Sequence, residues 1–247
     1  MAGLANRGLT VPMAPGKDGD PGIDTVLFDV DGTLLDSNYL HVAAWARAFA
    51  RFDLYPPTAT VHAAIGMGGD RLVAVVAGDG AEREHGDGLR AAWREEFEPT
   101  MSQLVALPGA AELVREVKRR GFKVALASSG VAEHVSFARR LLDLDDVVDG
   151  STSSDDAESS KPAGDIFAVA LQAVGGAAAA VVGDAPWDVQ AGRAIGAPVI
   201  ALGSGGFATG WLRDEGAAAV YADPADLLAH LDDTVLKAPG AAERDAG

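Results

Sequence analysis

The chain has 247 residues, of which 48% are hydrophobic, and its formal net charge is −16. This charge, with no cluster of Lys and Arg to override it, argues against DNA or RNA as a partner. There are no cysteines, which excludes a disulfide framework and thiol chemistry and fits a reducing compartment.

Both ends of the chain predict mobile tails. Residues 11–22 combine Pro, Gly and charged residues without a period, and residues 237–247 have the same character, so we expect tails over 1–22 and 237–247. The start lacks the features of a signal peptide, and no apolar stretch approaches about 18 residues. We therefore expect a cytoplasmic protein with no membrane partner.

The first expected strand covers residues 25–30, and three aspartates lie at its end or shortly after it. In the stretch FDVDGTLLDS (28–37), Asp29 and Asp31 lie two positions apart, and Asp36 follows within five residues. Asp-Gly is also a common turn pair. We interpret Asp36 as the cap of the helix that follows.

The next segment is too long for one strand-helix-strand step. From Asp31 to Ser128 there are 97 residues, whereas such a step needs roughly 30. No convincing strand lies in between, and the pattern is helical. The expected helices cover residues 41–52, 58–66, 70–78 and about 82–101. This predicts a helical cap domain over residues 37–105, in which Trp45 and Trp93 serve helix packing.

The rest of the chain alternates short apolar runs with helical segments. One helix is expected over 110–121, because it has basic residues in its last turn and a glycine stop. The further expected strands cover residues 122–128, 179–184, 198–203 and 218–223. The alternation predicts an α/β core with a doubly wound, Rossmann-like parallel sheet covered by helices on both faces. We assign residues 23–36 and 106–236 to this core domain.

Polar residues collect where these strands end. In an open α/β sheet, ligands bind beyond the carboxyl ends of the strands. Each residue taken singly is as well explained by a turn or a helix cap. Together they would bring four carboxylates, two hydroxyls and one ammonium to one edge, which indicates a functional site. The candidates are Asp29, Asp31, Ser128, Ser129, Gly130, Lys161, Gly183, Asp184 and Asp188.

Four motifs, in order along the chain, resemble those of the haloacid dehalogenase superfamily, whose members are mostly phosphatases. They are D-x-D-G-T at 29–33, Ser128 after an apolar strand, Lys-Pro at 161–162 and G-D-x-x-x-D at 183–188. The resemblance runs from about residue 24 to 233, and D-x-D-G-T is its most specific part. The insert is similar to the alpha-helical cap of the subgroup that includes phosphoglycolate phosphatase and beta-phosphoglucomutase.

This resemblance implies magnesium-dependent phosphoryl chemistry. Mg²⁺ prefers hard oxygen ligands, and it would be held by Asp29, the backbone carbonyl of Asp31, and Asp184 and Asp188, directly or through water. Asp29 would attack phosphorus and form an aspartyl-phosphate. Asp31 would protonate the leaving oxygen and then take a proton from the hydrolytic water.

Further residues would hold the phosphate group. By the same resemblance, Ser128 and the backbone amides near Gly32 and Ser129 would bind its oxygens. Lys161 would offset negative charge on the nucleophile and on the transferring group. The resemblance thus implies hydrolysis of a small-molecule phosphate ester, which the sequence does not identify.

A sugar phosphomutase of the beta-phosphoglucomutase type is the main alternative. The run DSNYLHVAAW (36–45) resembles the start of the mutase cap, including a histidine at the position of His41. Two departures favour a phosphatase. Mutases carry an acidic residue at the position of Gly183 and an arginine at the position that matches Gly69.

Other activities fit less well. Phosphonate-cleaving relatives need a cap lysine, and residues 37–105 contain none. Dehalogenating relatives lack the second aspartate, which is Asp31 here. A phosphorylation-receiver-like signalling protein is a remote alternative, because receivers are far shorter and lack both the insert and the D-x-D spacing.

The cap offers three candidates for substrate specificity, namely His41, Gly69 and Arg71. In the loop IGMGGDRL (65–72), glycines free the backbone to approach a ligand, and Arg71 would meet a polar or anionic group on it. An ordinary inter-helix turn with a solvated arginine explains the loop equally well.

Overall fold

The computed structural model describes residues 22–154, 156, 161, 163 and 165–237. The predicted tails, 1–22 and 237–247, lie outside these residues apart from Gly22 and Lys237. No helix within the described residues is long and apolar enough to cross a membrane.

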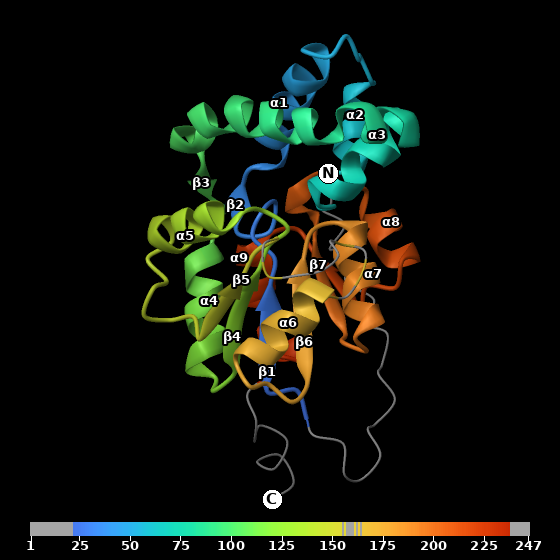
Figure 1. Cartoon of the computed structure of the whole chain (residues 1–247). Coiled ribbons are helices and arrows are strands. Elements are labelled where there is room, and N and C mark those ends of the chain that lie inside the picture. The colour runs from blue at the N-terminus through green and yellow to red at the C-terminus, as the bar shows by residue number, and fades with distance from the viewer. Residues whose placement is uncertain (1–21, 155, 157–160, 162, 164, 238–247) are drawn as a thin grey trace, which may run out of the picture.

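A six-stranded parallel sheet forms the core, in the order β5-β4-β1-β6-β7-β8 (Figure 1). The central strand β1 has the sequence TVLF and is fully buried, because helices cover both faces of the sheet. This confirms the predicted α/β fold with a doubly wound parallel sheet. The strands are β1 (Thr25–Phe28), β4 (Lys123–Ala127), β5 (Gly150–Thr152), β6 (Ala179–Gly183), β7 (Val199–Leu202) and β8 (Ala219–Tyr221).

Strand β5 was not expected from the sequence. It has three residues, two of which, Ser151 and Thr152, are polar, so it shows no apolar run. Its backbone pairs with β4 at the edge of the sheet. Pairing with a neighbour, rather than side-chain pattern, makes this segment a strand.

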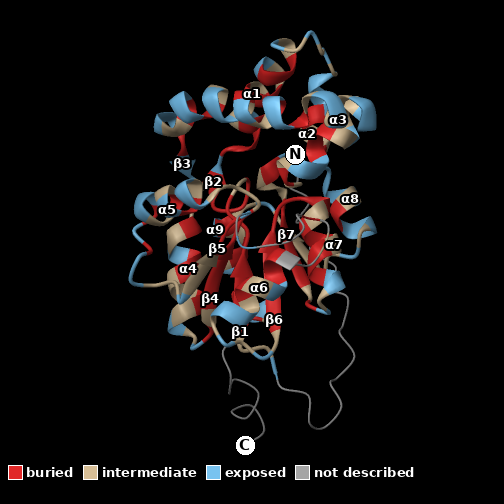
Figure 2. Ribbon diagram, viewed as in Figure 1, coloured by how far each residue is buried: buried red, intermediate tan, exposed pale blue. Residues whose placement is uncertain are grey.

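Two apolar layers lie on the two faces of the sheet, and Figure 2 shows the buried strands between helices with exposed outer sides. Side chains alternate along β1: Val26 and Phe28 pack with α4, α5 and α9, whereas Leu27 packs with α6, α7 and α8. These helices are α4 (Ala110–Arg119), α5 (Ala132–Leu141), α6 (Asp165–Ala173), α7 (Pro186–Ala194), α8 (Thr209–Asp214) and α9 (Pro224–Ala229). Two 3-10 turns, η2 (Gly203–Gly205) and η3 (Leu231–Asp233), complete the core.

The insert is helical, as predicted, and lies over one end of the sheet (Figure 1). Helix α3 is interrupted at Gly78, whose φ of 88° and ψ of 160° are not helical. This break separates the segments that the sequence indicated as two helices. The elements are α1 (Asn38–Ala50), α2 (Thr58–Ala63), α3 (Gly69–Phe97) and η1 (Glu98–Gln103).

Two short strands connect the insert to the core, and they correct two expectations. Strand β2 (Leu35–Asp36) pairs antiparallel with β3 (Val105–Ala106), in a segment where no strand was expected. Two-residue strands are too short to show a period. The interpretation of Asp36 as a helix cap was wrong: it lies in β2, and the N-cap position of α1 is Ser37.

Candidate active site

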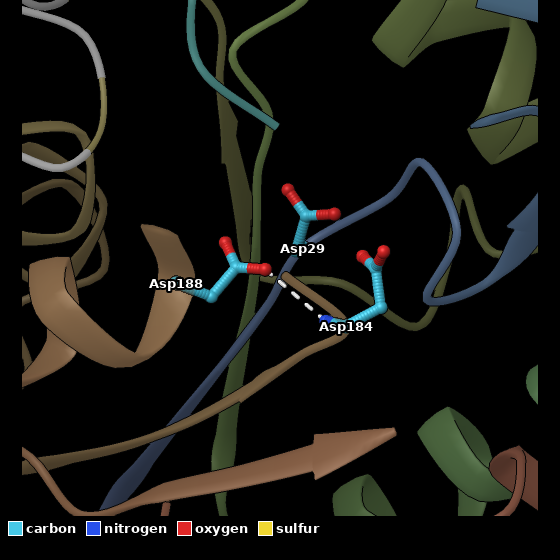
Figure 3. Close-up of side chains that lie close together, drawn as sticks. All are labelled: Asp29, Asp184 and Asp188. Atoms are coloured by element: carbon cyan, nitrogen blue, oxygen red, sulfur yellow. Dashed lines mark hydrogen bonds between the residues drawn. The ribbon is translucent and has the colours of Figure 1, made fainter. Parts of the chain in front are cut away.

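Three aspartates from separate segments meet beyond the carboxyl ends of β1 and β6 (Figure 3). Asp29 follows β1, Asp184 follows β6, and Asp188 lies in the first turn of α7. Each offers a carboxylate oxygen, and these oxygens lie within 4.8 Å of one another. The parallel arrangement of the strands brings them together, because their carboxyl ends share one edge of the sheet.

A buried lysine contacts this aspartate cluster. The side chain of Lys161 is 1% exposed, and its Nζ contacts Asp29 Oδ1 and lies 2.7 Å from Asp188 Oδ1. The ring of Phe167 lies 5.1 Å from the same nitrogen. Although burial lowers the pKa of Lys161, the carboxylates of Asp188 and Asp29 raise it above its usual value. Lys161 therefore stays charged.

The single positive charge of Lys161 does not neutralise the three carboxylates of the aspartate cluster. Burial and the charge of Asp188 raise the pKa of Asp29 to about 8, even with Lys161 beside it. Burial, Asp188 and Asp29 likewise raise the pKa of Asp184 well above its usual range. The protein must either protonate these groups or supply another cation. Buried, closely spaced carboxylate oxygens are ligands that suit a hard divalent cation such as Mg²⁺, so the donor set fits the metal that the resemblance implies.

Neighbouring polar groups fix the orientation of Asp184. Thr33 Oγ1 donates to Asp184 Oδ1 (2.9 Å), and Asn38 Nδ2 donates to Asp184 Oδ2 (2.8 Å). Asp188 Oδ2 accepts hydrogen bonds from the backbone N–H groups of Asp184 (3.1 Å) and Ala185 (2.9 Å). Sequence reasoning missed Thr33 and Asn38 as site residues. Thr33 belongs to the D-x-D-G-T motif and could have been found there, whereas Asn38 gives no local signal.

Two glycines allow the backbone to approach the aspartate cluster closely. A Cβ on Gly205 would lie 1.8 Å from Asp184 Oδ2, and a Cβ on Gly183 would lie 2.5 Å from Asp188 Cγ. Any side chain at either position would collide with a carboxylate. The sequence expectation noted Gly183 but not Gly205.

Asp31 makes a separate set of contacts, toward the cap. Its Oδ1 accepts a hydrogen bond from Ser37 Oγ (2.6 Å) and lies 3.1 Å from His41 Nε2. Burial raises the pKa of Asp31, but the charge of His41 and these hydrogen bonds lower it below its usual range. His41 stacks on Phe97, with ring centroids 4.0 Å apart. The cap residue His41 thus reaches Asp31, the carboxylate for which the resemblance implies a role in proton transfer.

The serines after β4 lie at the same edge of the sheet. Ser128 is 1% exposed, and its Oγ lies 3.5 Å from Asp31 Oδ2 and accepts a hydrogen bond from the Gly130 N–H (2.9 Å). Ser129 Oγ donates to the backbone carbonyl of Gly66 (3.3 Å), which belongs to the cap. Phosphate binding by Ser128, Ser129 and the Gly32 amide stays a prediction.

A cavity of about 320 Å³ opens between the core and the cap. The core contributes Asp29 and Asp31, among others, and the cap contributes His41 and Gly69. Arg71 is exposed and is not among the lining residues. Trp45 and Trp93 pack against each other as expected, with centroids 5.5 Å apart, but both also line the cavity. Arg94, which sequence reasoning did not single out, lines it too.

Comparison with known proteins agrees with this geometry. A family model described as haloacid dehalogenase-like hydrolase matches residues 23–196. Pyrophosphatase PpaX of Halalkalibacterium halodurans is 28% identical over 187 residues, which cover 73% of this chain and 84% of that protein. The structure of a hydrolase from Pseudomonas syringae superimposes with a TM-score of 0.80 at 34% identity and covers 85% of this chain and 98% of that one.

A more distant structure shares the fold alone. Beta-phosphoglucomutase of Clostridium difficile superimposes with a TM-score of 0.71 at 16% identity, covering 82% of this chain and 92% of that one. The two proteins therefore share the arrangement of an α/β core and a helical cap.

Proposed function

The chain belongs to the haloacid dehalogenase-like hydrolase family, and on that premise we propose that it is a magnesium-dependent phosphatase acting on a small-molecule phosphate monoester. The observation that carries this proposal is the aspartate cluster of Asp29, Asp184 and Asp188, buried beside Lys161. Family membership sets aside the signalling-receiver alternative. The cytoplasmic location expected from the sequence stays a prediction.

The first chemical step uses Asp29 as the nucleophile. A bond forms between an Asp29 carboxylate oxygen and phosphorus as the bond from phosphorus to the leaving oxygen breaks, which gives an aspartyl-phosphate. Asp31 donates its proton to the leaving oxygen. In the second step Asp31 takes a proton from water, whose oxygen attacks phosphorus and releases Asp29 and inorganic phosphate.

The surroundings of each aspartate suit its role. Lys161 contacts Asp29 and favours the ionised form that attacks phosphorus. Magnesium, when bound to the aspartate cluster, would neutralise the phosphate oxygens and the carboxylates. His41 and Ser37 hold Asp31 toward the cavity and stabilise its carboxylate, the form that accepts a proton. Donation to the leaving group requires the negative charge of the substrate to raise the pKa of Asp31.

The phosphomutase alternative finds less support. A mutase of the beta-phosphoglucomutase type would carry an acidic side chain at the position of Gly183. In this chain a Cβ there would lie 2.5 Å from Asp188 Cγ, so the site leaves no space for one. Hydrolysis, with release of inorganic phosphate, fits the site better than return of the phosphoryl group to a sugar.

A screen of phosphate monoesters with magnesium tests the proposal directly. We expect release of inorganic phosphate from at least one class of ester and full loss of activity after exhaustive chelation by EDTA. Absence of activity on every ester, or full activity after chelation, would contradict the proposal. Transfer of phosphate between sugar positions without release would favour the mutase.

Trapping the phosphoenzyme tests the nucleophile. Wild-type protein quenched in acid during turnover of a labelled phosphoryl donor should retain label, and Asp29→Asn should retain none. Asp31→Asn should retain the ability to form some phosphoenzyme with a good leaving group but should turn over slowly, because water stays unactivated. Label on the Asp29→Asn protein would place the nucleophile elsewhere.

A further inference from the structure

The cavity extends from the carboxylates of the core to helix α3 of the cap, which brings two arginines to it. Arg90 and Arg94 lie four residues apart on α3, so they share one face of the helix, and both line the cavity. In a chain with a net charge of −16, cations at a cavity that contains Asp29 and Asp31 need an explanation.

Contacts within the cap account for Arg90. Its Nη1 donates to Glu82 Oε1 (2.8 Å) and to the backbone carbonyl of Gly69 (3.1 Å), and its Nη2 donates to Asp87 Oδ1 (2.8 Å). The bond to Gly69 ties the second part of α3 to its first turn, across the break at Gly78. Arg90 therefore has a structural role, and its charge is neutralised by Glu82 and Asp87.

Arg94 differs from Arg90 in this respect. It lines the same cavity and is exposed, and its guanidinium has no hydrogen-bond or ion-pair partner among the described residues. Arg47 and Arg51 of the cap are paired, with Glu96 (3.0 Å) and Glu95 (2.7 Å) respectively. Arg71 and Arg83 form no such pair among the described residues, but they do not line the cavity. Arg94 thus presents an available guanidinium from the cap to the cavity that Asp29 and Asp31 line from the core.

Apolar side chains also line the cavity that Arg94 lines. Trp45, Met67 and Trp93 contribute apolar surface, and a volume of about 320 Å³ suits a small organic molecule. A guanidinium presents a planar fork of donors that matches a carboxylate or a phosphate group. The cavity is therefore lined by Asp29 and Asp31 of the core and by the unpaired guanidinium of Arg94 in the cap.

We propose that Arg94 binds a second anionic group, phosphate or carboxylate, on the leaving group of the substrate. This inference rests on the proposed phosphatase function and deepens it, because it narrows the substrate to a small organic phosphate with two anionic centres. Arg94 determines specificity and takes no part in the chemistry at phosphorus.

Matched substrate pairs and matched variants test this role. Phosphoglycolate is compared with 2-hydroxyethyl phosphate, and glucose 1,6-bisphosphate with glucose 1-phosphate, so that each pair differs in the second anion. The variants are Arg94→Gln, Arg94→Lys and the control Arg83→Gln. Arg83 is an exposed residue of the same helix and does not line the cavity.

For whichever doubly anionic substrate the wild-type enzyme prefers, Arg94→Gln should lower kcat/KM by about tenfold or more, the effect of losing a charge-assisted hydrogen bond. Activity on the partner without the second anion should change less than about twofold, and Arg94→Lys should recover part of the loss. Arg83→Gln should leave the ratio within each pair unchanged. An effect confined to phosphoglycolate would identify the second anion as a carboxylate, and an effect confined to the bisphosphate would identify it as a phosphate.

Three results would overturn the inference. They are equal losses on both members of a pair in Arg94→Gln, no loss on either member, and a wild-type enzyme that prefers the partner lacking the second anion. Each of these leaves the phosphatase proposal standing, because the wild-type enzyme is active. A wild-type enzyme that hydrolyses no phosphate ester with magnesium would overturn both. Arg71→Gln, run in parallel, tests the arginine indicated by the sequence.

Discussion

Replacing Asp29 with asparagine should stabilise the metal-free protein at alkaline pH while abolishing turnover. The folded state raises the pKa of Asp29 from its ordinary value of 3.8 to about 8. Between these pH values the folded protein binds more protons at this site than the unfolded chain does. The free energy of unfolding of the wild type therefore falls as the pH rises through this window. An amide at position 29 removes this penalty.

The magnitude follows from the same interval. The difference between 3.8 and about 8 corresponds to at most about 6 kcal/mol at and above pH 8. The attraction of Lys161 is already contained in this interval, because Lys161 lowers the pKa of Asp29. We expect Asp29→Asn to be more stable than the wild type at pH 8.5 by up to about 6 kcal/mol, or up to about 24 °C in Tm. At pH 4 the advantage should vanish.

Urea denaturation with EDTA at pH 4 and pH 8.5 measures this difference. Asp36→Asn is the matched control, because Asp36 is an exposed carboxylate of β2, and it should change stability little at either pH. Two results would refute the electrostatic reasoning. One is a difference in the free energy of unfolding between wild type and Asp29→Asn that is the same at both pH values. The other is a wild type whose stability relative to the variant increases as the pH rises.

Further predictions concern the metal, the glycines and the cap. Magnesium at about 100 times its Kd should stabilise the wild type by about 2.7 kcal/mol in thermal denaturation, and Asp184→Asn should lose this response; an undiminished shift would contradict the assignment of the metal site. Gly205→Ala places a Cβ 1.8 Å from Asp184 Oδ2 and should raise the magnesium concentration for half-maximal activity by about tenfold, whereas Gly210→Ala, with open space around it, should not. His41→Ala should lower kcat for the preferred substrate and for p-nitrophenyl phosphate alike, because His41 contacts Asp31; a loss confined to the preferred substrate would return it to the role in specificity that the sequence indicated.

Much of the fold could be predicted because local patterns report burial. The run TVLF and its counterparts in β4, β6 and β7 are continuous apolar segments, which is typical of strands covered on both faces. Strand β5 escaped prediction because its polar residues carry no such pattern. Asp36 was misassigned because an aspartate before a helix is equally compatible with a cap and with a short strand.

The candidate site likewise contains residues that a local sequence pattern indicates and residues that it does not. The spacing of Asp29, Asp31, Asp184 and Asp188 could be recognised in the sequence, because these residues follow strands whose carboxyl ends share an edge or, for Asp188, begin the next helix. The hydrogen bond from Asn38 to Asp184 joins residues 146 positions apart, and no local pattern encodes it. No local pattern shows that Arg94 lines the cavity and Arg71 does not, because this depends on how the cap packs on the core.

By itself, the sequence determined the α/β core, the helical insert and the aspartates of the motifs, because hydrophobic periodicity and residue spacing act over a few neighbouring positions. Only the tertiary structure decided that His41 contacts Asp31, that Gly205 leaves space for Asp184, and that Arg94 rather than Arg71 lines the cavity. These contacts depend on how the insert packs over the sheet, and that packing is set by the shapes and charges of residues distant in the chain.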